Sequence, residues 1–121
     1  MVDTRPVTVF CDIDGTLVTH KVPTETAKNT CSMVLLPKTL EKLLEWDKKG
    51  YNIILVSGRR ESMRKVTEKQ LTELGIIYDQ LILGIGGCKR YLINDRKPNG
   101  TEDCAIAINL ERNTGIEKVD I

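Results

Sequence analysis

The chain has little of what membrane, secreted and zinc-binding proteins need. No apolar run approaches the roughly 20 residues that cross a bilayer, and the N-terminus, Met-Val-Asp-Thr-Arg-Pro, lacks the apolar region of a signal peptide. The four cysteines include no Cys-x-x-Cys pair, and the single histidine offers no zinc ligand set beside them. We therefore expect a cytoplasmic protein with no membrane partner, whose cysteines are small buried hydrophobic residues.

The sequence also lacks an excess of charge of either sign. Its 18 Lys and Arg nearly balance 17 Asp and Glu, which gives a formal net charge of +1. This balance shows no sign of a nucleic-acid coat or of binding to an acidic membrane surface. With 121 residues, no internal repeat and no low-complexity linker, the sequence predicts a single domain over residues 1–121.

Strand and helix patterns alternate along the chain. The expected strands cover residues 6–13, 52–57, 80–83, 90–94 and 104–108, and a tail from residue 109 is expected to extend the sheet edge. The expected helices run from Pro37 until Gly50 stops the first, and from Glu61 to Leu74. Residues 17–36 are irregular and predict a short flap. This pattern predicts an α/β fold: an open, mostly parallel, twisted, Rossmann-like sheet with helices on both faces.

The direction of the last strand stays open. Only about nine residues separate residue 95 from residue 105, whereas a parallel crossover usually needs a dozen or more. The last strand therefore either pairs antiparallel or crosses without a helix.

Three of the expected strands end in residues that suit phosphate chemistry. Asp12 and Asp14 follow the first strand, and because strand side chains alternate, both carboxylates point the same way. Two anions held so close call for a divalent cation, and Mg²⁺ binds through few carboxylates and substrate phosphate oxygens. Ser57-Gly58-Arg59 ends the second strand and Asn94-Asp95 the fourth. Ligands of open α/β sheets bind at these carboxyl ends.

These motifs resemble those of the haloacid dehalogenase (HAD) superfamily of phosphotransferases. The segment from Asp12 to Leu17, Asp-Ile-Asp-Gly-Thr-Leu, resembles the first motif, an Asp-x-Asp-Gly-Thr that follows a strand. The apolar strand that ends at Ser57 resembles the second motif, and Leu-Ile-Asn-Asp, which ends at Asp95, resembles the fourth. The resemblance covers the chain from about Val7 to Arg96.

The resemblance implies a role for each matching residue. Asp12 would be the nucleophile that becomes an aspartyl phosphate, and Asp14 would be the general acid and base. The Asp12 carboxylate, the Asp14 carbonyl and the Asp95 carboxylate would bind Mg²⁺. Ser57 would donate a hydrogen bond to a phosphoryl oxygen. The further residues expected to bind substrate are Gly15, Thr16, Gly58 and Arg59.

The third motif of the family is missing its lysine. Relatives of this layout often carry Gly-Lys-Pro directly after the third strand, where this chain has Gly-Ile-Gly-Gly at residues 84–87. We rank Lys97 first for this catalytic role, because it begins close to Asp95 at the expected edge of the sheet. Lys89 ranks second, and Arg59 could share the role.

The intervals between motifs hold only the flap, a helix and a strand, so the resemblance implies a capless phosphatase with an open site. Such a site takes a large substrate or is covered by a neighbouring subunit of a homo-oligomer. The sequence places a Mg²⁺-dependent phosphomonoesterase first, acting through an aspartyl phosphate on a small phosphorylated substrate such as a sugar phosphate. One alternative is a polynucleotide 3′-phosphatase, against which the near-zero charge counts modestly. The other alternative is a degenerate relative that binds phosphorylated ligands without catalysis.

Overall fold

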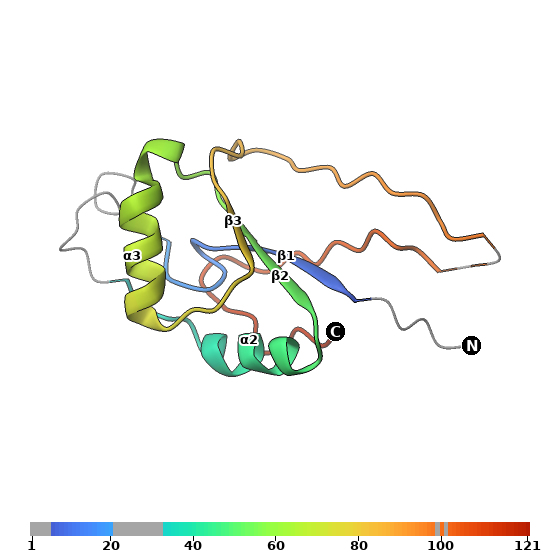
Figure 1. The fold of residues 1–121 in the computed structure, drawn as a ribbon, viewed down its shortest axis with the longest axis horizontal. Coiled ribbons are helices and arrows are strands. Elements are labelled where there is room, and N and C mark those ends of the chain that lie inside the picture. The colour runs from blue at the N-terminus through green and yellow to red at the C-terminus, as the bar shows by residue number, and fades with distance from the viewer. Residues whose placement is uncertain (1–5, 21–32, 99, 101) are drawn as a thin grey trace.

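The computed structural model describes residues 6–20, 33–98, 100 and 102–121. Its elements, in chain order, are β1 (Thr8–Asp12), α2 (Thr39–Lys48), β2 (Asn52–Val56), the single 3-10 turn η1 (Glu61–Met63), α3 (Arg64–Leu74) and β3 (Gln80–Ile82) (Figure 1). These elements confirm the first three expected strands and both expected helices. Neither α2 nor α3, the helices of the described part, is long and apolar enough to span a membrane.

The three strands form one open parallel sheet in the order β1-β2-β3. Cys11 of β1 lies opposite Leu55 of β2, which lies opposite Leu81 of β3. Because the strands are parallel, their carboxyl ends meet at one edge. This arrangement confirms the predicted α/β class with an open parallel sheet.

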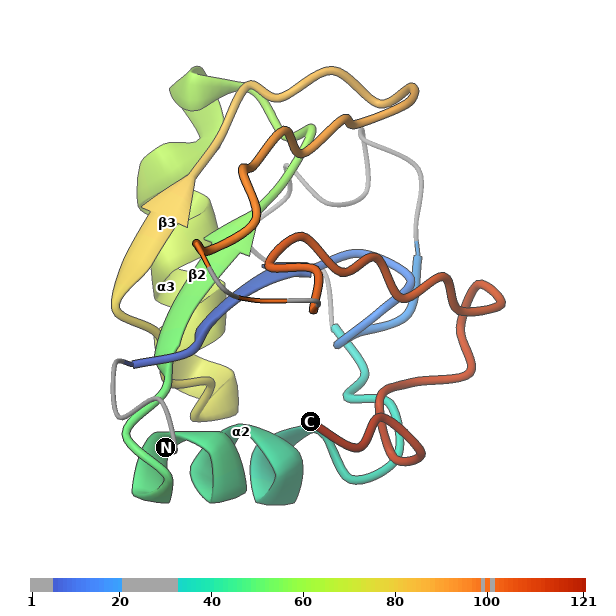
Figure 2. The same ribbon diagram turned by 90° about the vertical axis from the view of Figure 1, so that its right-hand side faces the viewer.

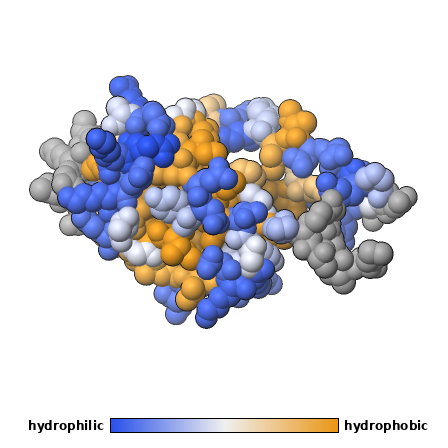
Figure 3. Space-filling view, in the orientation of Figure 1, coloured by the Kyte–Doolittle hydropathy of each residue, from blue (hydrophilic) through white to orange (hydrophobic). Residues whose placement is uncertain are grey.

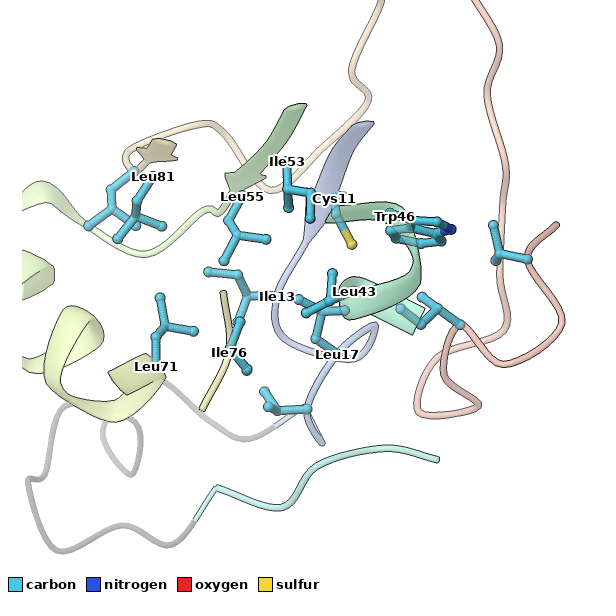
Figure 4. Packing of buried hydrophobic residues seen from close by; sticks show 14 residues of the cluster. Cys11, Ile13, Leu17, Leu43, Trp46, Ile53, Leu55, Leu71, Ile76 and Leu81 are labelled. Atoms are coloured by element: carbon cyan, nitrogen blue, oxygen red, sulfur yellow. The ribbon is translucent and has the colours of Figure 1, made fainter. Parts of the chain in front are cut away.

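One face of the sheet carries the core. Cys11, Leu55 and Leu81 point to this face and are buried together with Leu43 of α2 and Leu71 of α3 (Figure 4). Figure 2 shows α3 behind β2 and β3. Burying a side chain such as Leu contributes about 1.5–3 kcal/mol to stability, so the helices are held on this face by apolar contact.

The opposite face of the sheet carries neither helix. Its residues include the polar Thr8, Asn52 and Gln80, and Phe10 is 53% exposed there and Ile82 39% exposed. The expectation of helices on both faces is therefore not met by the described residues, in which α2 and α3 share one face. The polar residues at alternate strand positions account for this, because they suit a half-solvated sheet.

The start of α2 is tied to the loop that follows β1. The helix begins at Thr39 rather than at Pro37, and Lys38 precedes it with a left-handed φ of 62°. The Thr39 hydroxyl donates a hydrogen bond to the carbonyl of Leu17 at 2.8 Å. The base of the expected flap forms an antiparallel bridge between Val18 and Leu35, whereas residues 21–32 of the flap lie outside the described residues.

The chain beyond β3 forms a long arm rather than two more strands. Residues 86–98 and 102–110, which we call the arm, run away from the sheet and return to it (Figure 1). Ile93 is 91% exposed and Ile106 is 73% exposed, and Figure 3 shows hydrophobic surface along the arm. The strands expected at residues 90–94 and 104–108 are thus wrong in the described part. The connection from β3 to residue 90 is too short for a parallel crossover, which needs about a dozen residues. The apolar segment at residues 90–94 therefore has no neighbouring strand to pair with.

The tail after the arm returns to the core and does not extend the sheet edge. Ile116 is 2% exposed and Val119 is 8% exposed, and both belong to the core cluster. The Asn113 amide donates a hydrogen bond to the carbonyl of Gly15 at 2.8 Å. The tail therefore supports the loop that carries the first motif.

The cysteines divide between core and arm. Cys11 is buried as expected, whereas Cys88 and Cys104 are exposed, which corrects the expectation for these two. Cys31 lies outside the described residues. The exposed pair sits on the arm, where no core forms in the described part of the chain.

Candidate active site

The site lies at the carboxyl edge of the sheet, where β1 and β2 end. Asp12 is the last residue of β1, and Ser57 directly follows β2. Between Asp12 and Val18 the chain makes a tight loop in which the Gly15 amide donates to the Val18 carbonyl at 2.7 Å. Gly15 has a φ of +85°, a left-handed conformation that glycine adopts without strain. The loop keeps Asp12 and Asp14 at the same edge as Ser57.

Asp12 is the accessible carboxylate of the pair. Its side chain is 38% exposed, and one oxygen, Oδ1, lies 3.4 Å from Nη1 of Arg90. The other oxygen, Oδ2, accepts a hydrogen bond of 3.4 Å from the Thr16 hydroxyl. Both contacts are long for hydrogen bonds to a charged group, so the Asp12 carboxylate stays open to a ligand.

Asp14, in contrast, is held on both oxygens by Arg59. The Arg59 Nε donates to Oδ2 at 2.9 Å, and Nη2 donates to Oδ1 at 2.8 Å. The Arg59 side chain is 5% exposed and the Asp14 side chain 20%. This bidentate geometry fixes the carboxylate of Asp14 in one orientation.

Every N–H group of Arg59 has an acceptor. An arginine side chain carries five donors, of which two bond to Asp14. Nη1 donates to Thr67 at 3.1 Å and to Gln70 at 2.8 Å, and Nη2 also reaches the sulfur of Met33 at 3.6 Å. Arg59 therefore has no donor left for a phosphate in this structure, and its geometry suits a residue that positions Asp14.

Ser57 is buried at the end of β2, with 2% of its surface exposed. Its Oγ accepts a hydrogen bond from the Arg59 amide at 3.1 Å, and a hydroxyl still has its own O–H to donate. Gly58 follows, and a Cβ there would lie 3.1 Å from the carbonyl oxygen of Ile85. The Ile85 amide also donates to the Ser57 carbonyl at 3.1 Å, so the root of the arm is fastened against the site.

The remaining predicted site residues lie on the arm. Asp95, Lys89 and Lys97 are exposed there, and in the described part they form no hydrogen bond or ion pair with Asp12 or Asp14. Asp95 lies five positions beyond the residue that contacts Asp12, which is about 17 Å of extended chain. Among the described residues no group of three His, Cys, Asp or Glu side chains comes together to hold a metal.

Two of the residues expected to bind Mg²⁺, Asp12 and Asp14, lie close together in the structure. Asp12 and Asp14 offer hard oxygen donors at the same loop, and the Asp12 carboxylate is accessible. Mg²⁺ needs only one or two carboxylates, together with water and substrate phosphate. Asp12 and the Asp14 carbonyl therefore fit this ion, and the Asp95 ligand remains a prediction.

Cys11 lies next to Asp12 but points into the core. Burial raises the pKa of its thiol to about 12 from the ordinary 9.0, and the neighbouring Asp12 charge adds to the shift. A thiol that stays protonated is a poor nucleophile and a poor metal ligand. Cys11 therefore packs, as the alternation of the strand predicted.

Sequence reasoning missed Arg90, the cation that lies against Asp12. Lys97 was favoured for its closeness to Asp95, which was expected at the sheet edge. The sequence signal was present, because Arg90 is a basic residue in the segment that follows the third strand. Only the path of the arm shows that this position reaches Asp12.

Comparison with known proteins points to one family. Residues 6–84 match the family described as the polynucleotide kinase PNKP phosphatase domain. This match contains the first and second motifs and ends before the arm. No curated protein matches the chain at a significant level.

Solved structures of similar fold include two of a Pnkp1/Rnl/Hen1 complex. One is 28% identical, covers 74% of this chain and 32% of that chain, and has a TM-score of 0.56. The other, described as an RNA repair complex, is 29% identical over 67% of this chain and 27% of that chain, with a TM-score of 0.54. The match to the present chain thus covers less than a third of the length of these two relatives. A protein from Vibrio cholerae, 19% identical over 75% of this chain and 81% of that chain at a TM-score of 0.51, shares the fold.

Proposed function

Because the chain belongs to the family of the polynucleotide kinase PNKP phosphatase domain, a family of HAD-like phosphatases, we propose that it hydrolyses 3′-phosphates at nucleic-acid ends. The family match over residues 6–84 is the observation that carries this proposal. This match favours a polynucleotide 3′-phosphatase over a sugar-phosphate phosphatase. Sugar phosphates therefore serve as comparison substrates in the test below. The likeness to a protein of an RNA repair complex supports the same substrate class.

The proposed reaction begins with Asp12. Its accessible carboxylate attacks the phosphorus, the bond from phosphorus to the ester oxygen breaks, and an aspartyl phosphate forms. The electron pair of the broken bond goes to the leaving 3′-oxygen, which takes the proton of Asp14 in its acid form and leaves the Asp14 carboxylate that pairs with Arg59. Water then attacks the aspartyl phosphate while Asp14 accepts a proton from it. Phosphate leaves and Asp12 is restored.

Other residues of the site orient these groups. Arg59 holds the Asp14 carboxylate through two hydrogen bonds, and the Ser57 hydroxyl is proposed to donate to a phosphoryl oxygen. Mg²⁺, held by Asp12 and the carbonyl of Asp14, would offset the repulsion between carboxylate and phosphate. We keep Asp95 as its expected third ligand.

The open site suits the end of a polymer. Asp12 is 38% exposed, and in the described residues no cap domain stands over it. A polymer end can exclude water with its own bulk, which a small sugar phosphate does less well. A homo-oligomer whose neighbouring subunit covers the site stays a prediction.

A substrate comparison tests the proposal. The chain is incubated in Mg²⁺ with oligonucleotides of one sequence that carry phosphate at the 3′ or the 5′ end, as RNA and as DNA, and with a panel of sugar phosphates. We expect kcat/KM for a 3′-phosphate to exceed that for the 5′-phosphate and for each sugar phosphate by at least about tenfold, a preference of about 1.4 kcal/mol. Faster hydrolysis of a sugar phosphate would return the function to small metabolites.

A further inference from the structure

We propose that Arg90 is the cation that binds the transferred phosphoryl group at Asp12, the role expected from the sequence for Lys97 or Lys89. This inference rests on the proposed function, because it concerns the same phosphate. It assigns a catalytic residue from the arm, which lies outside the family match over residues 6–84.

The position of Arg90 is the first argument. Its Nη1 lies 3.4 Å from Oδ1 of Asp12, one of the two oxygens of the proposed nucleophile. No other cation of the described residues forms an ion pair with Asp12. A phosphoryl group bound to Asp12 would therefore lie within reach of this guanidinium.

The commitments of three other arginines, Arg59, Arg64 and Arg96, are the second argument. All five donors of Arg59 are bound to acceptors, two on Asp14 and the others on Thr67, Gln70 and Met33. Arg64 bonds to Glu61 and to the carbonyl of Leu81, and Arg96 pairs with Asp103 at 2.8 Å. Within the described part of the chain, Arg90 bonds through Nη1 alone, and its other N–H groups can serve a ligand.

The weakness of the Arg90–Asp12 pair is the third argument. The two side chains are 37% and 38% exposed, and exposed pairs of this kind contribute little to stability. At 3.4 Å the contact is longer than a strong charge-assisted bond. Arg90 can therefore exchange Asp12 for phosphate oxygens, which a guanidinium binds with two parallel N–H groups.

The root of the arm keeps Arg90 near the site. The Gly84 amide donates to the Arg59 carbonyl at 2.7 Å, and the Ile85 amide donates to the Ser57 carbonyl at 3.1 Å. The chain that follows β3 is thus fixed beside the end of β2 before it reaches Arg90. The chemistry needs such a charge, because the Asp12 carboxylate and the phosphate dianion repel each other.

Five proteins are compared: wild type, Arg90→Ala, Arg90→Lys, Lys97→Ala and Arg96→Ala. The readouts are kcat and KM with a 3′-phosphorylated oligonucleotide in Mg²⁺, and calorimetric binding of inorganic phosphate. We expect Arg90→Ala to lower kcat by about 100-fold and to weaken phosphate binding by about tenfold. Arg90→Lys should recover part of the lost kcat and part of the lost phosphate binding. Arg96→Ala, on the same arm but paired with Asp103, is the matched control and leaves both within about threefold.

The outcomes separate this inference from the proposed function. If wild type is active and Arg90→Ala stays within about threefold in kcat and phosphate binding, Arg90 has no such role. If kcat and phosphate binding fall in Lys97→Ala alone, the inference is also overturned, and Lys97 takes the role. If wild type does not act on the oligonucleotide, the proposed function fails, and phosphate binding alone decides: weaker binding by Arg90→Ala supports the role of Arg90, and equal binding overturns it.

Discussion

Asp14 and Arg59 form a bidentate ion pair that joins the loop after β1 to the end of β2, with hydrogen bonds of 2.9 and 2.8 Å. The same guanidinium bonds to Thr67 and Gln70 of α3. One buried side chain thus connects the first motif, the second motif and a core helix. Removing it leaves a carboxylate without its partner.

Arg59→Met is expected to destabilise the fold strongly. Breaking a buried pair from one side leaves an uncompensated charge, so we predict a loss of about 3–5 kcal/mol in the free energy of unfolding. Urea unfolding followed by the fluorescence of Trp46, which is 2% exposed, measures this quantity.

Lys69→Met is the control for this substitution, because Lys69 lies on α3 and pairs with Glu73 at 4.0 Å on the surface. We expect it to change the free energy of unfolding by less than about 1 kcal/mol. Equal effects of the two substitutions would show that Arg59 is not a structural connection.

Asp12→Asn is expected to abolish turnover while the fold is kept. The amide is a far weaker nucleophile than the carboxylate, so kcat should fall by about 10⁴-fold. Because Asp12 is 38% exposed and weakly paired, the free energy of unfolding should change by less than about 1 kcal/mol. Phosphate release and urea unfolding measure the two quantities, and normal turnover by this variant removes Asp12 as the nucleophile.

Gly15→Ala is expected to disturb the loop of the first motif. Its φ of +85° strains any L-residue, and the added Cβ would lie 3.2 Å from Cγ of Arg112. We predict a loss of about 1–2 kcal/mol in stability from the conformation alone, and a lower kcat because this loop carries Asp14 and begins at Asp12.

Gly50→Ala is the matched control, since Gly50 has a φ of +79° and open space around it, far along the chain from the motif. It should lose comparable stability and keep its kcat. If both variants keep full activity, the geometry of the Gly15 loop does not limit catalysis.

The stability of the protein should fall more steeply above pH 9 because of Cys11. Burial raises the pKa of this thiol from 9.0 to about 12. Between these values an unfolded thiol loses its proton and the folded one keeps it, so rising pH favours unfolding by up to roughly 1.4 kcal/mol per pH unit. The stabilisation that comes from keeping the Cys11 thiol protonated is fully present below about pH 9 and is lost as pH approaches about 12.

Cys11→Ala removes this dependence. Urea unfolding of both proteins from about pH 8 to about pH 11 should show the steeper decline in wild type only, since other titrating groups are common to both. Parallel curves would mean that the Cys11 thiol ionises in the folded protein as it does in the unfolded chain.

The sequence predicted the part of the site that depends on local geometry. Asp12 and Ser57 lie where their strands end, and strand ends follow from apolar runs and their breaks. The bond from Arg59 to Asp14 could not be predicted from sequence. It depends on how α3 packs beside β2, where Thr67 and Gln70 of α3 accept hydrogen bonds from the Arg59 guanidinium. The contact of Arg90 with Asp12 depends in the same way on the path of the arm.

The failures of prediction have a common cause. The segments at residues 90–94 and 104–108 carry the apolar residues of strands, yet a strand also needs a neighbour to satisfy its backbone, and the short connection after β3 provides none. On α2, the apolar Leu44 is 47% exposed, while Trp46, two residues further on, is 2% exposed. The packing partners of a helix, and not its sequence alone, decide which face is buried.

The central claim is that Asp12 captures the phosphoryl group, and a single-turnover trapping experiment tests it most directly. The Asp14→Asn variant, which lacks the base of the second step, is mixed with Mg²⁺ and p-nitrophenyl phosphate, whose leaving group departs without a proton from Asp14, then quenched in acid, digested and examined by mass spectrometry. We predict one added phosphoryl group on the peptide that contains Asp12, removable by hydroxylamine. A peptide without this group, from enzyme that releases phosphate under the same conditions, would contradict the account.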